Sequence, residues 1–220
     1  MKAAPELSGE AEKGSISESA YQLLRSRIFG GELAPGTLLT ERRLADDLGA
    51  SRTPLRAAIK RLEGERLIER AGAGGFVVRQ VSVDELLEIL SIRRLLEGEA
   101  AALAAERMPA DVIERLVVAS RAIVAEPDIT LDEYWAYDDV FHRELANGGG
   151  KPLLARLITE LRRQARMCHV KTMDRRFDAQ AAEHLLVLEA IARHQPADAR
   201  QAMEEHEDRV KERLLTWLAR

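Results

Sequence analysis

Residues 40–78, TERRLADDLGASRTPLRAAIKRLEGERLIERAGAGGFVV, decide the fold of the first part of the chain. Thr40 can cap a short helix that Gly49 closes, and Ser51 can cap the next helix, whose first turn tolerates Pro54. Two short apolar runs around a glycine-rich tip then predict a β-hairpin. We expect a further helix before this stretch, beginning at Ser15–Ser17 and ending at Gly30–Gly31. Three helices followed by a hairpin wing over residues 15–80 predict a winged helix-turn-helix domain.

The start of the third helix, SRTPLR at residues 51–56, carries side chains that suit DNA. Arg52 and Arg56 lie one turn apart, and each can bind a guanine edge in a major groove or clamp a phosphate. Hydroxyl groups at a helix N-terminus can bind phosphate oxygens, and glycine backbone at the wing tip can approach a minor groove. The predicted contacts are therefore Arg42, Ser51, Arg52, Thr53, Arg56, Gly72, Gly74 and Gly75. The alternative is that Arg52, Arg56, Lys60 and Arg61 form an ordinary solvated helix face.

The composition is that of a helix-rich globular chain of one large or two small domains. Of the 220 residues, 32% are charged, 46% are hydrophobic and only 4% are aromatic. The net charge of −4 hides an asymmetry, since residues 15–80 carry 11 Lys/Arg against 8 Asp/Glu and residues 81–220 carry 20 against 26. A small basic part joined to a larger acidic part favours a polyanion as the partner of the first.

The single cysteine, Cys168, excludes an internal disulfide and fits a reducing cytoplasm. No apolar run approaches the length needed to span a membrane, so we expect a cytoplasmic protein without a membrane partner.

Residues 1–14 are polar and aperiodic, and we expect a disordered tail there. Residues 81–220 show helical periodicity throughout, punctuated by proline and glycine. The expected helices span residues 83–107, 111–126, 131–147, 152–172, 178–194 and 198–219. Because their connections are short, they predict an antiparallel six-helix bundle, which makes the chain mainly α.

Four polar residues lie on apolar, inward-facing stripes of these helices: Asp138, His142, His184 and His206. The last two helices turn around Pro196, so an antiparallel pair places His184 and His206 at nearly the same height. One carboxylate and three imidazoles suit a divalent transition metal, zinc first, with nickel or manganese as alternatives. The alternative for each histidine is a hydrogen-bonded core residue. Asp139 is expected to face solvent, and His169 and His194 fit no shared site.

Both halves of the chain resemble a known family. The pattern over residues 17–79 resembles the DNA-binding domain of GntR-family bacterial transcription regulators, which implies contacts to DNA by Arg42, Arg52, Arg56 and the wing glycines. Residues 83–215, with D..FH, EH..VLEAI and A...M..H, resemble the FCD ligand-binding domain of the FadR subfamily. The resemblance implies metal ligation by Asp138, His142, His184 and His206. The family usually has glycine where this chain has Arg66, so we expect local backbone strain there.

The resemblance further implies a homodimeric regulator, expected to be a repressor, that binds a short palindromic operator in double-stranded DNA. Its effector is expected to be a small organic acid or sugar acid, bound in a metal-containing cavity. Arg93 lies on an inward line of the first FCD helix and can bind the effector carboxylate or form an ion pair with Glu97. Two other hypotheses stay open, a helical-bundle metalloenzyme and a regulator whose metal is purely structural.

Overall fold

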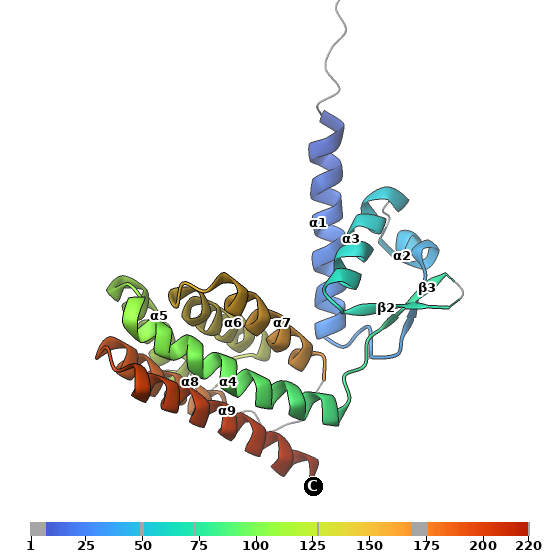
Figure 1. Ribbon diagram of the computed structural model, residues 1–220. Coiled ribbons are helices and arrows are strands. Elements are labelled where there is room, and N and C mark those ends of the chain that lie inside the picture. The colour runs from blue at the N-terminus through green and yellow to red at the C-terminus, as the bar shows by residue number, and fades with distance from the viewer. Residues whose placement is uncertain (1–7, 49–50, 73, 127, 169–175, 220) are drawn as a thin grey trace, which may run out of the picture. The chain divides into compact units, whose positions relative to one another are not determined.

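The computed structural model describes residues 8–48, 51–72, 74–126, 128–168 and 176–219, which form two compact units. One unit comprises Met1–Ser82 with Arg166–His169, and the other comprises Val83–Ala165 with Val170–Arg220. Each unit has its own buried apolar core. Figure 1 shows the helices and strands of both units.

The first unit is a winged helix-turn-helix, as the sequence predicts. Its helices are α1 (Ser8–Phe29), α2 (Glu41–Leu48) and α3 (Arg52–Gly64), and its strands are β1 (Leu38–Leu39), β2 (Ile68–Ala71) and β3 (Gly75–Val78). The strands are antiparallel in the order β1-β3-β2. Apolar side chains from α1, α3 and the start of β2 form the core: Leu24, Ile28, Leu55, Ile59, Leu62, Leu67 and Ile68.

The helix and strand bounds of this unit differ from the prediction in two places. Helix α1 begins at Ser8, so residues 8–14 are helical and only residues 1–7 of the expected tail lie outside the described residues. Residues 10–13, rich in Glu, Ala and Lys, have high helix propensity, and extending an existing helix costs little compared with starting one. The wing also gains a third strand, β1, which at two residues is too short to show a period-two pattern.

Strand β1 is positioned by a turn at Ala34–Thr37. The Thr37 N–H donates to the Ala34 carbonyl at 3.0 Å, and Gly36 has a φ of 81°. Proline followed by glycine in the left-handed region suits a type II turn. The Gly36 N–H then donates to the Val78 carbonyl at 2.8 Å, which attaches the turn to β3.

The two ends of α3 depart from ordinary capping. Ser51 is the N-cap residue, but its side chain makes no capping hydrogen bond, contrary to the prediction. The reason is that the third helical position, whose N–H such a cap usually binds, is Pro54. At the other end Arg66 has a φ of 55°, and its N–H bonds the Glu63 carbonyl while the Leu67 N–H bonds the Leu62 carbonyl. This pair of bonds is a Schellman motif, so the predicted strain at Arg66 is confirmed.

The second unit is a bundle of helices α4 (Val83–Arg107), α5 (Ala110–Ala125), α6 (Leu131–Gly148), α7 (Pro152–Arg166), α8 (Phe177–Ala192) and α9 (Pro196–Leu218). Helix α4 runs alongside α9, and α5 packs on α8 (Figure 1). The spans agree with the prediction to within two residues except that α7 ends at Arg166, and residues 169–172 of the longer expected helix lie outside the described residues. None of the described helices is long and apolar enough to cross a membrane.

Replacing Arg66 with glycine should stabilise the first unit by about 1 kcal/mol, because a non-glycine residue in the left-handed region carries a cost of that order. Urea unfolding followed by circular dichroism measures the change. His194→Gly is the matched control, since His194 occupies the same position of a Schellman motif with a φ of 54°. Its Nδ1 bonds the Ala105 carbonyl at 2.8 Å, so glycine there should stabilise less. A loss of stability in Arg66→Gly would contradict the claim that the backbone is strained at Arg66.

Candidate metal centre

Three helices of the bundle bring the four predicted ligands together. Helix α6 carries Asp138 and His142 one turn apart, α8 carries His184, and α9 carries His206. All four side chains are buried, with His184 entirely inaccessible. The inward placement follows from the apolar stripes around them, which include Phe141, Leu188 and Met203 in the core of the bundle.

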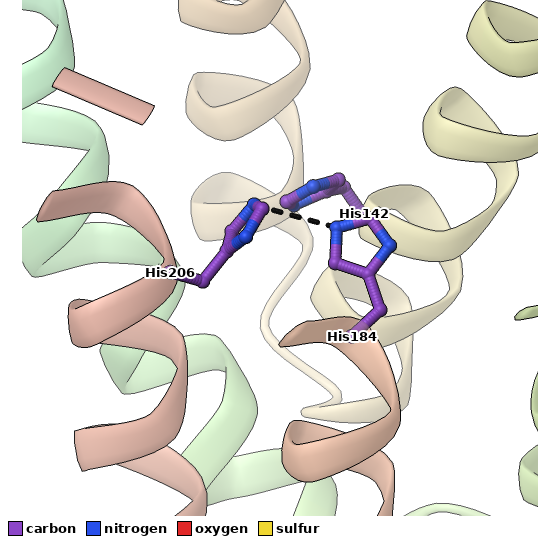
Figure 2. Close-up of side chains that lie close together, drawn as sticks. All are labelled: His142, His184 and His206. Atoms are coloured by element: carbon purple, nitrogen blue, oxygen red, sulfur yellow. Dashed lines mark hydrogen bonds between the residues drawn. The ribbon is translucent and has the colours of Figure 1, made fainter. Parts of the chain in front are cut away.

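The three imidazole rings converge on a shared centre (Figure 2). The Nε2 atoms of His184 and His206 are 3.3 Å apart. The Asp138 Oδ1 atom lies 3.6 Å from Nε2 of His142 and 3.8 Å from Nε2 of His184. One ring nitrogen from each histidine lies within 4.8 Å of the others. The structure therefore brings together all four residues that the sequence singled out.

The outer nitrogen of each ring is held by a different group. His142 Nδ1 contacts Glu97 Oε2, His206 Nδ1 bonds Glu183 Oε2 at 2.8 Å, and His184 Nδ1 bonds the Tyr137 hydroxyl at 2.7 Å. A carboxylate only accepts hydrogen bonds, so the rings of His142 and His206 carry a proton on Nδ1 and, when neutral, present an Nε2 lone pair to the centre. His142 Nε2 has no hydrogen-bond partner among the described residues.

A buried arginine, Arg162 of α7, lies beside this centre and was missed by the sequence reasoning. Its Nη2 contacts Asp138 Oδ2, and its Nη1 is 3.7 Å from Glu97 Oε1. The signal was present, because Arg162 continues the inward line of Ala155 and Ile158. It was overlooked because an arginine on a helix is usually exposed.

Charge in the cluster shifts several pKa values. Burial disfavours the ionised form of Asp138, but Arg162, followed by His142, outweighs it and holds the pKa of that carboxyl well below its usual range. Burial, followed by His206 and His142, holds the pKa of His184 well below its usual range, so this ring is neutral. Burial also opposes ionisation of Glu183, but hydrogen bonds from His206 and Arg213 lower its pKa to about 2.

Arg93 forms the ion pair that was one of its two predicted roles. Its Nε bonds Glu97 at 2.7 Å and its Nη2 bonds Glu207 at 2.6 Å. Contact with an effector carboxylate stays a prediction for this residue. Asp139, expected to face solvent, is half-buried and lies 4.0 Å from Arg162 Nη2. His194 is exposed, and His169 lies outside the described residues.

The residues present fit a divalent transition metal. Zinc binds histidine nitrogens at about 2.0–2.1 Å, so the ligand atoms of a tetrahedral site are separated by about 3.4 Å. The separations of 3.3, 3.6 and 3.8 Å lie close to this value. Each histidine also has its second nitrogen bound to a carboxylate or a hydroxyl, as metal-binding histidines almost always do. Imidazoles in the neutral form and a carboxylate supply the lone pairs that such a cation binds.

Most predicted DNA contacts lie on the surface of the first unit. Arg42, Thr53, Arg56 and the wing residues Gly72 and Gly74 are exposed, and Arg56 Nε bonds Glu41 at 2.8 Å. Ser51 is exposed too, with its hydroxyl not used as a cap. Only the backbone of Arg52 is described, as the first residue of α3.

Of the residues predicted at the surface, Gly75 is buried, whereas Arg61 is exposed but paired with α1. Gly75 is buried in β3, where an added Cβ would come within 2.9 Å of the Leu39 carbonyl, so it serves the contact with β1 and not the wing tip. Arg61 lies with its guanidinium 3.6 Å from the centre of the Tyr21 ring and bonds Glu18 at 2.7 Å, which ties α3 to α1.

Comparison with known families agrees with both units. The model of the FCD domain matches residues 88–209, and the model of the bacterial regulatory proteins of the gntR family matches residues 16–78. The chain is a GntR-family transcription regulator. Its FCD domain places it in the FadR subfamily, as the sequence patterns predicted.

Individual relatives of this GntR regulator are similar over much of its length. It is 29% identical to the Escherichia coli HTH-type transcriptional regulator McbR over 154 residues, 70% of each protein. It is 34% identical to the Bacillus subtilis gluconate operon transcriptional repressor over 133 residues, 57% of this chain and 51% of the relative. The structure of E. coli McbR/YncC has the same fold, with a TM-score of 0.73 and 22% identity over 92% of this chain and 98% of that one. The GntR regulator is therefore not an enzyme, and the metalloenzyme hypothesis falls.

Replacing Arg162 with methionine should destabilise the bundle by about 3–5 kcal/mol, because it leaves buried carboxylates of Asp138 and Glu97 without this cation. The exposed Arg156 on the same helix provides the control, and Arg156→Met should change stability by less than about 0.5 kcal/mol. Urea unfolding in the presence of chelator measures both.

The loss of stability caused by Arg162→Met should depend on pH. The folded-state pKa of Asp138 is depressed, so its contribution to stability is present at neutral pH and is lost as the pH falls through that value. The difference between wild type and Arg162→Met should therefore shrink on acidification. A difference that is small at pH 7 or grows toward low pH would contradict the pairing.

Proposed function

We propose that this regulator represses transcription from a palindromic operator, and that a small carboxylate effector changes its DNA affinity through a metal ion held by Asp138, His142, His184 and His206. The observation that carries the proposal is the convergence of three histidine nitrogens and the Asp138 carboxylate on one buried point. His142 Nε2 has no hydrogen-bond partner there among the described residues, and a divalent cation would remove the cost of burying it unpaired.

The charge balance around the centre supports a bound cation. Four carboxylates are buried there, from Glu97, Asp138, Glu183 and Glu207, against two equally buried guanidiniums, from Arg93 and Arg162. The less buried Arg213 pairs with Glu183 at 2.8 Å. Burial raises the pKa of Glu207, and its Oε2 has no hydrogen-bond partner among the described residues. The raised pKa values of Glu207 and His142 both favour an added proton in this cluster, and a metal ion at the centre would take the place of that positive charge.

We propose a carboxylate as the effector because the metal ion and Arg162 would both offer it positive charge. A transition ion that expands to five or six ligands would keep open positions beside the three histidines and one carboxylate, and an anionic ligand can fill them. Arg162 touches the outer oxygen of Asp138, so its guanidinium is next to any ligand of the ion and can pair with a second oxygen of that ligand. Arg93 is one contact further away, through Glu97. An effector of this type would alter the position of α7 relative to α6, and DNA affinity would respond through population shift.

A purely structural metal is the second candidate, and the complete burial of His184 favours it. The two roles predict different results. A structural ion stabilises the fold but leaves DNA affinity insensitive to small acids, whereas a sensing ion makes a panel of hydroxy acids and sugar acids shift both the unfolding temperature and the operator affinity.

We further propose that two copies act together, because a palindromic operator presents the same half-site twice. Helices α4 and α7 contribute Ala100, Ala155 and Ile158 to one buried cluster, together with Ala146 of α6. Apolar side chains exposed on these two helices offer surface for such a dimer: Ile92, Leu95, Leu153 and Leu157.

Arg56→Ala and Arg52→Ala should each weaken specific DNA binding by about 1–3 kcal/mol if the side chain reads a base. An operator selected from random DNA, with binding measured at fixed salt, provides the assay. Arg115→Ala is the control, because Arg115 is an exposed arginine of α5 in the other unit. Normal affinity in both helix α3 variants would exclude the proposed recognition helix.

His184→Ala should remove bound metal while leaving the DNA affinity of metal-free protein largely intact, because His184 lies in the second unit. Elemental analysis of purified protein and DNA binding in chelator measure the two effects. His194→Ala, an exposed histidine outside the cluster, should keep the metal content of the wild type. A wild-type protein that holds no transition metal after growth in metal-replete medium would refute the proposed site.

A further inference from the structure

His184 differs from the other two histidines in the group that holds its outer nitrogen. His142 and His206 face carboxylates, which accept and never donate. His184 Nδ1 faces the hydroxyl of Tyr137, which can either donate to the ring or accept from it. The proton on a neutral His184 is therefore not placed by its immediate neighbour alone.

The hydroxyl of Tyr137 is in turn bonded to a buried serine on another helix. Tyr137 donates to Ser120 Oγ at 2.8 Å, and Ser120 donates to the Leu116 carbonyl at 2.8 Å. A backbone carbonyl only accepts, so this chain of donors runs in one direction. With its one proton directed to Ser120, Tyr137 can only accept from His184, and the imidazole must then carry its proton on Nδ1.

We propose that Ser120, acting through Tyr137, holds His184 in the Nδ1–H tautomer whose Nε2 lone pair binds the metal ion. Ser120 is a positioning residue, since it touches neither the metal nor any of the four ligands. The inference rests on the proposed metal site and names a residue that sets its affinity.

Packing fixes the position of the His184 ring, so only the choice of which nitrogen carries the proton is left to its hydrogen-bond partners. The ring stacks on Phe141 with centroids 3.8 Å apart and planes inclined by 9°. His184 and Ser120 are both wholly inaccessible to water. With the ring plane set by packing, Nε2 points at the centre whichever nitrogen carries the proton, and only the Nδ1–H form leaves a lone pair there.

Removing the Ser120 hydroxyl reverses which nitrogen of His184 carries the proton. In Ser120→Ala the Tyr137 proton has no acceptor except His184 Nδ1, which must then be unprotonated. The neutral ring accordingly carries its proton on Nε2, where it can donate toward His206 Nε2, 3.3 Å away. Metal binding to this variant requires the Tyr137 hydroxyl to give up its only acceptor, which weakens binding without removing a ligand.

The experiment measures Zn²⁺ affinity by competition with a chromophoric chelator and the unfolding temperature of metal-free protein. Ser120→Ala should bind Zn²⁺ about 10–100-fold more weakly than wild type, with an unchanged metal-free unfolding temperature. Tyr137→Phe should weaken binding in the same range, and Ser120→Ala in the Tyr137→Phe background should cause no further loss, because Ser120 acts only through Tyr137. Ser91→Ala is the control. The Ser91 hydroxyl also bonds the carbonyl four residues earlier, that of Leu87, at 2.8 Å, but Ser91 lies on α4, which carries none of the four proposed ligands.

A second measurement needs no metal. Long-range ¹H–¹⁵N spectra of metal-free Ser120→Ala should show His184 as the Nε2–H tautomer. Wild-type Zn²⁺ affinity in Ser120→Ala, an additive loss in the double variant, or an Nδ1–H tautomer in Ser120→Ala would each overturn the proposal. If wild type binds no Zn²⁺, the metal site itself fails, and the tautomer spectra still decide whether Ser120 orients His184.

Discussion

Three imidazole groups and a carboxylate turned toward one buried point form the constraint around which the second unit is organised. Contacts with neighbouring side chains turn these four groups inward. Glu97, Glu183 and Tyr137 take the outer nitrogens of the rings, and Arg162 takes the outer oxygen of Asp138. The inner nitrogens and Asp138 Oδ1, which also accepts from the Tyr134 hydroxyl at 3.2 Å, are thereby brought together, an arrangement that a cation would stabilise and that an apolar core would not tolerate.

The same cluster links most of the bundle. The four proposed metal ligands come from α6, α8 and α9. Helix α4 contributes Glu97 and Arg93, α7 contributes Arg162, and α5 contributes the hydroxyl of Ser120. A change of charge at the centre therefore acts on several helices at once, which is how a small ligand can shift a packed domain between two arrangements. In the proposed function the DNA-binding unit would supply the readout, with Arg56 exposed on α3 and the wing built on Gly36, Gly74 and Gly75.

Periodicity was sufficient to predict the helices, the winged unit and the convergence of Asp138, His142, His184 and His206, because apolar stripes report which side of a helix is buried. The strained Arg66 was also predictable, since its position follows a helix where glycine is usual. Pro54 already excluded the usual capping bond of Ser51, but this was overlooked. By contrast, the partnership of Arg162 with Asp138 and of Ser120 with Tyr137 depends on how helices distant in sequence align, and a single sequence carries no such information. Strand β1 was missed because two residues show no period.

Crystals of the protein grown with Zn²⁺ and measured at the zinc absorption edge test the central claim most directly. The account predicts one strong anomalous peak per chain, bonded to Nε2 of His142, His184 and His206 and to Oδ1 of Asp138, with every Nδ1 still facing Glu97, Tyr137 or Glu183. A chain without an anomalous peak at this centre, or a zinc ion bonded through the Nδ1 atoms, would contradict it.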